Sequence, residues 1–437
     1  MNPCDYIIKG DAVACMDAVC TVHNDAAIAV SDGLILEVGA QAGIENKYKP
    51  EKVLGGKGRV IMPGLVNSHT HAPMVLMRGL ADDMPLKTWL EEYIWPTENK
   101  WLSEEFVRDA ARLACLEMIR SGSTTFCDMY FFEGVVAEVA EEMGLRAVLT
   151  AGIIDFPTHT TKGPDDCLEK ALNNIEKFKG QELLAPGIGL HSPYTCSPDT
   201  IKKAVSMALE HDVLLSVHLS ETEWEVGEVR ERYGNTPAMH LDSLGYFEAR
   251  TLNHHCVWLT SEEMVLMAEK GANVAHCPQS NLKLGSGIAP VPEMLNAGLN
   301  VCLGTDGAAS NNDLDMLGEL NAAALLHKGA WKDPTVVDSS TAISMATANG
   351  ARALGLEGTG VIREGAEADL VLVDMRKPHL TPVYNTLSHL AYSVKSSDVE
   401  TVMVKGRLLM EEGSVLGVDE QEIMDRAAHW GRKIRES

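Results

Sequence analysis

Short apolar segments alternate with longer amphipathic segments along the middle of this chain. The short segments are rich in β-branched side chains, and the longer ones carry apolar residues at helical spacing. This order predicts repeated strand–helix units, which build a parallel sheet. The eight predicted strands are Val60–Val66, Thr124–Asp128, Arg146–Ile154, Gly187–His191, Leu214–Leu219, Thr251–His255, Asn273–His276 and Val301–Asp306. The helices predicted between them include Ser103–Arg120, Ser197–His211, Thr260–Lys270 and Ser340–Leu354.

Eight such units close naturally into a barrel. We therefore predict the α/β class, with a (β/α)8 TIM-type barrel as its main domain. Both ends of the chain have a different pattern, with short strands such as Tyr6–Lys9 and Val402–Leu409 separated by turn residues. These ends predict a small β-sandwich domain formed by both termini. The predicted boundaries are residues 1–58 and 365–437 for the small composite β domain and 59–364 for the barrel.

Composition narrows the classes of partner. The 437 residues include 45% hydrophobic ones, enough for a sizeable core, and the formal net charge is −25. Such a charge repels nucleic acids and anionic membrane surfaces, so a small neutral or zwitterionic molecule is the expected partner. The first residues do not resemble a secretory leader, and no apolar run reaches the roughly 20 residues that span a bilayer. We expect a cytoplasmic protein whose ten cysteines are mostly reduced.

The most informative motif is His69-Thr70-His71 at the end of the first apolar segment. Side chains at positions i and i+2 of a strand point to the same face, so both imidazoles can reach one ion. The same pattern also arises by chance on half-buried strands. His191, His218, His255 and Asp306 give the pair more weight, because they end later predicted strands.

In a barrel of this type the carboxyl ends of the strands meet at one face, where active sites lie. Neutral imidazoles and a carboxylate are ordinary ligands for Zn²⁺ or Fe²⁺, and a catalytic metal keeps one position open for water. Binding to the metal lowers the pKa of that water to about 7. The sequence therefore predicts a metal-dependent catalytic site in which three histidines and one aspartate suffice as ligands.

Glu221 stands three residues after His218, in the run VHLSETEWE. Its carboxyl group could carry protons beside a metal without binding it. It could equally cap the helix that follows, and the sequence alone leaves both interpretations open. Strand alternation also predicts that His254 faces away from His255.

Six segments carry a resemblance to a known family. They are PGLVNSHTHAPMVLMRG, GLHSPYTCSP, VHLSETEWEV, NHHCVWL, VAHCPQSNLKLGSG and LGTDGAASNNDLDM. Because these segments occur in this order, the chain resembles the amidohydrolase superfamily. Within it, the chain resembles the 5-methylthioadenosine/S-adenosylhomocysteine deaminases, a group that includes 5′-deoxyadenosine deaminases. The resemblance implies a hydrolytic deaminase that converts 5′-substituted adenosines into inosine analogues and ammonia. The candidate substrates are S-adenosylhomocysteine, 5′-methylthioadenosine, 5′-deoxyadenosine and adenosine.

The resemblance also implies roles for individual residues. Asp306 takes the proton from the attacking water, Glu221 relays protons to the adenine N1, and His255 orients the hydroxide. One Zn²⁺ per subunit is implied, with Fe²⁺ as the alternative. The implied metal ligands are His69, His71, His218 and Asp306.

Substrate contacts follow from further matches. Glu98, in IWPTENK, matches the glutamate that accepts hydrogen bonds from both ribose hydroxyls, and His191 matches the histidine that contacts the adenine. Without the resemblance, the sequence predicts that Glu98 is a solvated surface residue. Trp89 and the Met-rich stretch Met74–Met84 are candidates to cover the nucleoside, or are plain core. Ser310 is a further candidate for substrate binding.

Two departures from the family pattern matter. Some relatives hold the carboxylate of S-adenosylhomocysteine with arginines after strand 3, whereas here the only cation near Ala151–Asp155 is Lys162. Smaller 5′ groups are therefore equally compatible with the sequence. No lysine ends strand 4, where binuclear relatives carry a carboxylated lysine, so a mononuclear site is expected.

Two alternatives stay open from the sequence. One is a related amidohydrolase that acts on a free base or a triazine, of the guanine deaminase or chlorohydrolase type. The other is a barrel that binds a metal without catalysis. Relatives are commonly oligomeric, so we expect a homo-oligomer. The sequence does not define the preferred 5′ substituent or the native metal.

Overall fold

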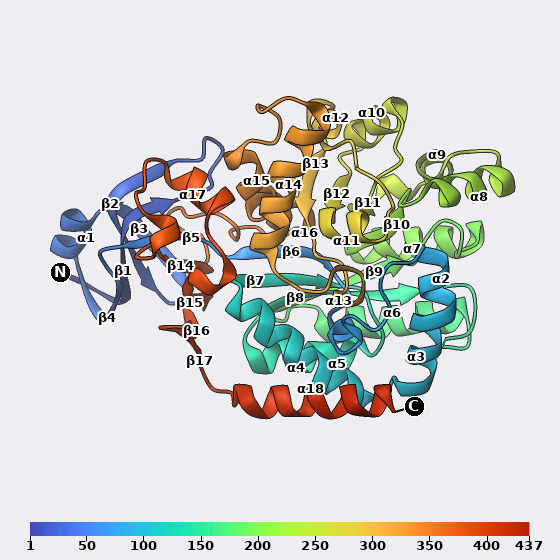
Figure 1. The fold of residues 1–437 in the computed structure, drawn as a ribbon, viewed down its shortest axis with the longest axis horizontal. Helices are drawn as coiled ribbons and strands as arrows, with labels where there is room; N and C mark the ends of the chain where they lie inside the picture. The colour runs from blue at the N-terminus through green and yellow to red at the C-terminus, as the bar shows by residue number, and fades with distance from the viewer. Residues whose placement is uncertain (159, 437) are drawn as a thin grey trace.

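The barrel is built from eight parallel strands (Figure 1) in a computed structural model that describes residues 1–158 and 160–436. Each strand pairs with the next along the chain, in the order β13-β12-β11-β10-β9-β8-β7-β6. The strands are β6 (Leu65–Thr70), β7 (Ser123–Asp128), β8 (Arg146–Ile153), β9 (Leu184–Leu190), β10 (Leu214–Leu219), β11 (Thr251–His255), β12 (Asn273–His276) and β13 (Asn300–Leu303).

The barrel closes through the segment that follows β13. The Asp306 amide donates to the His69 carbonyl at 2.9 Å, and the Thr305 amide donates to Asn67 Oδ1 at 3.0 Å. Asn67 Nδ2 donates in return to Thr305 Oγ1 at 2.8 Å. These bonds hold the first and last strands together, which confirms the predicted (β/α)8 barrel.

Helices surround the barrel and connect its strands (Figure 1). Within the described ranges, none is long and apolar enough to cross a membrane. The helices between β6 and β10 are α2 (Leu86–Thr88), α3 (Trp95–Trp101), α4 (Glu104–Arg120), α5 (Glu133–Met143), α6 (Pro164–Phe178) and α7 (Pro198–His211). Those from β10 onward are α8 (Glu223–Tyr233), α9 (Pro237–Ser243), α10 (Ser261–Glu269), α11 (Pro278–Lys283), α12 (Val291–Asn296), α13 (Ala308–Asn311), α14 (Met316–Trp331), α15 (Ser339–Met345) and α16 (Ala348–Leu354).

Both termini contribute to a second β structure, as predicted, and it is one mixed sheet. Its path is β17-β16-β15-β14-β5-β1-β2-β3, with β4 paired to β1. A single apolar core cluster draws on strands from both ends of the chain. The elements are β1 (Asn2–Ala14), β2 (Val22–Ser31), β3 (Leu34–Ala40), α1 (Gln41–Lys47), β4 (Tyr48–Gly55), β5 (Arg59–Pro63), β14 (Leu370–Asp374), α17 (Thr386–Tyr392), β15 (Val399–Val404), β16 (Arg407–Glu411) and β17 (Ser414–Val415). The terminal helix α18 (Glu420–Arg435) packs along α4.

The first predicted strand, Val60–Val66, is wrong in its boundaries. Its first half is β5, which pairs with β1 and β14, and its second half begins β6 of the barrel. The chain passes between the two sheets at Gly64, where a Cβ atom would lie 2.0 Å from Thr124 Oγ1. Only glycine permits this close approach of the backbone to β7. The division of the chain into two domains stays a prediction.

Candidate metal centre and active site

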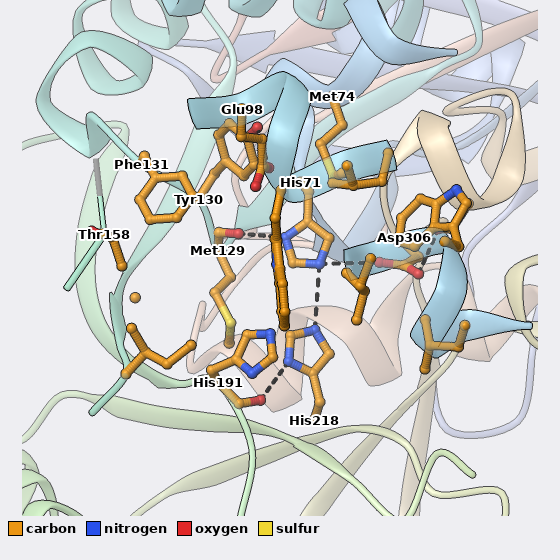
Figure 2. Close-up of a pocket in the computed structure, with 18 of the residues that line it drawn as sticks. His71, Met74, Glu98, Met129, Tyr130, Phe131, Thr158, His191, His218 and Asp306 are labelled. Atoms are coloured by element: carbon orange, nitrogen blue, oxygen red, sulfur yellow. Dashed lines mark hydrogen bonds and ion pairs between the residues drawn. The ribbon is translucent and has the colours of Figure 1, made fainter. Parts of the chain in front are cut away.

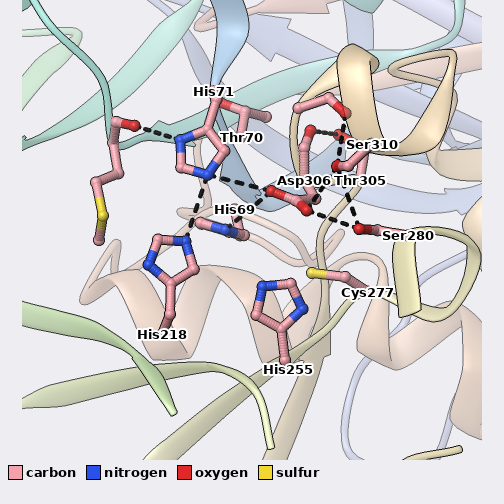
Figure 3. A network of polar contacts seen from close by, with 12 residues as sticks. His69, Thr70, His71, His218, His255, Cys277, Ser280, Thr305, Asp306 and Ser310 are labelled. Carbon is pink, nitrogen blue, oxygen red and sulfur yellow. Dashed lines mark hydrogen bonds and ion pairs between the residues drawn. The ribbon is translucent and has the colours of Figure 1, made fainter. Parts of the chain in front are cut away.

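Three of the predicted ligands converge at the end of β6 and the loop after β13. His69 Nε2 lies 3.3 Å and His71 Nε2 lies 3.2 Å from Asp306 Oδ1. His218, from β10, brings its Nε2 atom to 3.3 Å from His71 Nε2. Figure 3 shows these four side chains pointing toward one another inside the barrel mouth. The structure thus brings together all four ligands predicted from the sequence.

Hydrogen bonds at the other ring nitrogen fix two of these imidazoles. His71 Nδ1 faces the Met129 carbonyl, and His218 Nδ1 lies 2.7 Å from the His191 carbonyl. A carbonyl only accepts, so each Nδ1 carries a proton, and each Nε2 presents a lone pair when its ring is neutral. Two lone pairs 3.3 Å apart repel each other unless a cation lies between them. Such carbonyl partners are the usual orienting groups of metal-binding histidines.

Charge and burial also fit a divalent cation. Although burial alone would raise it, His69 and His71 hold the pKa of Asp306 well below its usual range. Although burial would lower it, Asp306 raises the pKa of His71 to about 9, so this position attracts positive charge. In the buried His69, Nδ1 has no hydrogen-bond partner among the described residues, and Nε2 has only the contact with Asp306 at 3.3 Å. The ligand atoms of His69, His71 and Asp306 all lie within 4.8 Å of one another, as do those of His69, His218 and His255.

The second oxygen of Asp306 is held away from the histidines. Ser280 Oγ and Ser310 Oγ each donate to Asp306 Oδ2 at 2.7 Å (Figure 3). This arrangement leaves Oδ1 directed at His69 and His71. Ser310 therefore contacts Asp306 and also lines the cavity. Its predicted role in substrate binding stays a prediction.

Glu221 faces the metal centre from the other side. Its Oε2 lies 3.8 Å from His255 Nε2, and its Oε1 accepts from Ser286 Oγ at 3.2 Å. Thr222, not Glu221, caps α8, because Thr222 Oγ1 accepts from the Glu225 amide. The helix-capping interpretation of Glu221 is therefore wrong. Burial raises the pKa of its carboxyl group above the ordinary value.

Glu225 fixes the backbone around Glu221. Its two carboxyl oxygens accept from the amides of Ser220 and Glu221, at 2.9 and 2.8 Å. Burial raises the pKa of Glu225 to about 8. This pair of bonds defines where Glu221 stands relative to the ligands. The sequence analysis missed Glu225, although its place one helical turn after Glu221 was a usable signal.

The prediction that His254 faces away from His255 is wrong. The His254 ring stacks on His69, with ring centroids 3.6 Å apart, so it also points into the barrel. The cause is the backbone of His255, whose φ of 68° breaks the alternation of the strand. His255 then reaches the cavity as well, and its Nδ1 lies 2.8 Å from Asn281 Oδ1.

A cavity of about 340 Å³ opens beside the metal centre. Glu98, on α3, is buried in its wall, and the Tyr130 hydroxyl donates to Glu98 Oε1 at 2.6 Å. Burial raises the pKa of Glu98 to about 7. His191 lines the cavity as well, and burial lowers its pKa to about 4, so its ring is neutral. The solvated-surface interpretation of Glu98 is wrong, because helix α3 turns this side chain inward.

The cavity also contains residues from the long loop after β6. Trp89 is buried and lines the cavity, as does Met74, so both predicted covering elements reach it. The sequence analysis missed Tyr130, which lies two residues beyond β7. A polar side chain just past a barrel strand was the signal for it, as it was for the histidines. Figure 2 shows Glu98 and Tyr130 on the same side of His71.

Known proteins are similar to this chain along nearly its whole length. Residues 60–409 match the sequence model of the amidohydrolase family. A 5-methylthioadenosine/S-adenosylhomocysteine deaminase from Thermodesulfovibrio yellowstonii is 47% identical over 435 residues, 99% of each chain. A 5′-deoxyadenosine deaminase from Methanosarcina mazei is 44% identical over 97% of this chain and 96% of that protein. A crystal structure of an adenosine deaminase from Xanthomonas campestris with bound zinc superposes with a TM-score of 0.98, at 37% identity and full coverage of both chains.

Proposed function

This chain belongs to the amidohydrolase family, and from that premise we propose that it is a hydrolytic deaminase of 5′-substituted adenosines. The products are the inosine analogue and ammonia. The observation that carries the proposal is one cavity in which a set of metal-ligand side chains and the buried Glu98 face the same space. The metal-ligand side chains suit the attack of a water molecule on a purine carbon, and Glu98 suits the binding of a ribose.

The metal centre determines where the reaction takes place. A divalent ion held by His69, His71, His218 and Asp306 would lower the pKa of a water molecule and supply hydroxide at neutral pH. We propose one Zn²⁺ per subunit, with Fe²⁺ as the alternative, since imidazole and carboxylate suit both. Asp306 accepts the proton of the attacking water on a carboxylate oxygen.

Proton transfer to the purine falls to Glu221. We assign its Oε2 to deliver a proton to N1 while the water oxygen adds at C6. His255, with its Nδ1 hydrogen directed at Asn281, presents Nε2 beside the same carboxyl group and steadies the adduct. The C6 amino group then takes the proton held by Asp306 and leaves as ammonia, while the hydroxyl proton of the adduct returns to Glu221 as C6 becomes a carbonyl.

Recognition of the nucleoside uses the cavity wall. Glu98 accepts hydrogen bonds from the two ribose hydroxyls, a charge-assisted pair that a free base cannot make. His191 contacts the adenine ring, and Trp89 covers the nucleoside from the loop after β6. We further propose a homo-oligomer in the cytoplasm with no nucleic-acid or membrane partner, and two domains divided at residues 58/59 and 364/365.

Ammonia release from a panel of substrates tests the proposal. We expect deamination of 5′-methylthioadenosine, 5′-deoxyadenosine and adenosine, measured as kcat/KM with the metal content determined on the same sample. Removal of the metal with a chelator should abolish turnover, and re-addition of Zn²⁺ should restore it. A preference for guanine, or no ammonia from any adenosine derivative by the metal-loaded protein, would refute the proposal.

A Glu98→Gln variant tests ribose recognition. We expect kcat/KM for nucleosides to fall by about 100-fold, because an amide accepts from the two hydroxyls less well than a carboxylate. Any turnover of free adenine should change little. The matched control is Glu92→Gln, which alters an exposed glutamate on the neighbouring helical turn.

The pH dependence provides a second measurement of the same contact. Since burial raises the pKa of Glu98 to about 7, ionisation of this carboxyl strengthens ribose binding above that pH. The KM for a nucleoside should therefore fall between about pH 6 and about pH 8 in the native enzyme. In the Glu98→Gln variant this change should disappear. Equal nucleoside turnover by both proteins would contradict ribose recognition by Glu98.

A further inference from the structure

Within residues 1–158 and 160–436, the end of the cavity that is remote from Asp306 has no lysine or arginine side chain. Figure 2 shows Asp306 at one end and Phe131 and Thr158 at the other, with Glu98 and Tyr130 between them. Phe156 precedes Thr158 by two residues and also lines the cavity, and its ring packs at 6.0 Å between centroids against Trp95. We call this region the outer end, defined by Trp95, Phe131, Phe156 and Thr158.

The position of the substrate follows from the proposed function, on which this inference rests. C6 of the purine faces Asp306 and Glu221, and Glu98 holds the ribose hydroxyls. The 5′ carbon is attached on the side of the ribose that is remote from C6. Whatever replaces the 5′ hydroxyl therefore extends toward the outer end of the cavity.

The acidic side chains of the cavity wall have no lysine or arginine opposite them among the described residues, and its basic groups are the imidazoles of His71, His191, His218 and His255. Its acidic residues are Glu98, Glu221, Glu225 and Asp306, and no lysine or arginine lines it within residues 1–158 and 160–436. Lys162, the one cation that the sequence places nearby, is exposed and is not part of the wall. A carboxylate that packs against this wall would lose water contacts without gaining a lysine or arginine partner among the described residues, which costs binding free energy.

The outer end suits apolar 5′ substituents better than it suits a carboxylate. Phe131, Phe156 and Trp95 present aromatic rings, and Ile154 adds an aliphatic side chain to the wall. A thioether sulfur makes favourable contacts with the edges of aromatic rings. A methylthio group, or a 5′ carbon that bears only hydrogen, therefore fits the outer end without an unpaired charge.

We propose that the outer end is a 5′ subsite for small uncharged substituents, and that it selects against the charged amino-acid tail of S-adenosylhomocysteine. The comparison uses kcat/KM for 5′-methylthioadenosine, S-adenosylhomocysteine and 5′-butylthioadenosine, whose neutral tail has the length of homocysteine. We expect kcat/KM for S-adenosylhomocysteine to be about 100-fold lower than for methylthioadenosine. For the butylthio compound, kcat/KM should stay within about tenfold of the methylthioadenosine value.

The outcomes separate this inference from the proposed function. Turnover of S-adenosylhomocysteine within about threefold of methylthioadenosine would overturn the inference and leave the deaminase proposal intact. Equally poor turnover of the butylthio compound would show exclusion by size and would overturn the argument from charge. Failure of the deaminase proposal would appear differently, as no ammonia from methylthioadenosine.

A substitution tests the same subsite by gain of activity. Phe156 is 40% exposed, so an arginine at this position can be accommodated at the protein surface. We expect Phe156→Arg to raise the ratio of kcat/KM for S-adenosylhomocysteine over methylthioadenosine about tenfold, because a guanidinium pairs with the tail carboxylate. The control Phe156→Gln removes the ring without adding charge and should leave the ratio low. An unchanged ratio in a folded Phe156→Arg enzyme would contradict the placement of the tail.

Discussion

Replacing Glu221 with glutamine is expected to reduce kcat for 5′-substituted adenosines by about 10²- to 10⁴-fold. An amide can accept and donate hydrogen bonds, but it cannot carry a proton from water to the purine nitrogen. The site should otherwise stay intact, since Gln keeps the size of the side chain and its contact with Ser286. Single-turnover kinetics on metal-loaded protein would measure the chemical step directly.

The metal content distinguishes a proton carrier from a ligand. Glu221 belongs to neither group of side chains whose ligand atoms converge, so the Glu221→Gln variant should bind the same amount of metal as the native protein. Glu223→Gln is a matched control, because this exposed residue lies two positions along the same segment. Loss of metal together with activity would identify Glu221 as a ligand instead. A kcat within about threefold of the native value would exclude proton transfer by this residue.

The barrel could be predicted from the sequence because its strands are buried on both faces. Their short apolar runs contrast with the longer amphipathic helices between them, and length and β-branched content together with period separate the two. The prediction of a single strand at Val60–Val66 is wrong, because two strands of different sheets follow each other there without a polar residue between them. The pairing of β5 with β1 and β14, and the close approach of Gly64 to Thr124, show that the chain changes sheets there, and these contacts are tertiary.

The candidate metal ligands could be predicted for two reasons. A parallel barrel brings the carboxyl ends of all strands to one face, which singled out six residues at strand ends, and the resemblance to the family selected His69, His71, His218 and Asp306 among them. His254 could not be placed, because the alternation rule assumes regular backbone and His255 has a positive φ. Strain of this kind depends on the surrounding packing and leaves no mark in the local sequence.

Residues that orient the site were harder to find. Ser280, Asn281 and Ser286 lie in the segment after β12, where small polar residues are common for many reasons. Their hydrogen bonds to Asp306, His255 and Glu221 become visible only when the strands are assembled. The resemblance to a family named the candidate residues for substrate and metal binding, whereas the structure was needed to see what holds them.

The largest expected effect on stability comes from Asp369, which joins the barrel to the mixed sheet. Its carboxylate pairs with Arg146, at the start of β8, with Oδ2 3.1 Å from the arginine Nε, and their side chains are 1% and 6% exposed. It also accepts from the Lys405 amide at 2.7 Å. We expect Asp369→Ala to lower the free energy of unfolding by about 3 kcal/mol, because it leaves a buried guanidinium without its main partner.

Denaturant unfolding followed by circular dichroism measures this loss, and an exposed pair provides the comparison. Glu138→Ala breaks the pair with Arg108, whose side chains are 54% and 35% exposed, and should cost less than about 1 kcal/mol. A double variant, Arg146→Met with Asp369→Leu, should be more stable than Asp369→Ala, since it removes the buried charge together with its partner. If Asp369→Ala and Glu138→Ala unfold at the same denaturant concentration, desolvation of Arg146 contributes little. In that case the two sheets are held together by their apolar contacts and backbone hydrogen bonds, among them the bond from the Gly64 amide to the Asp369 carbonyl.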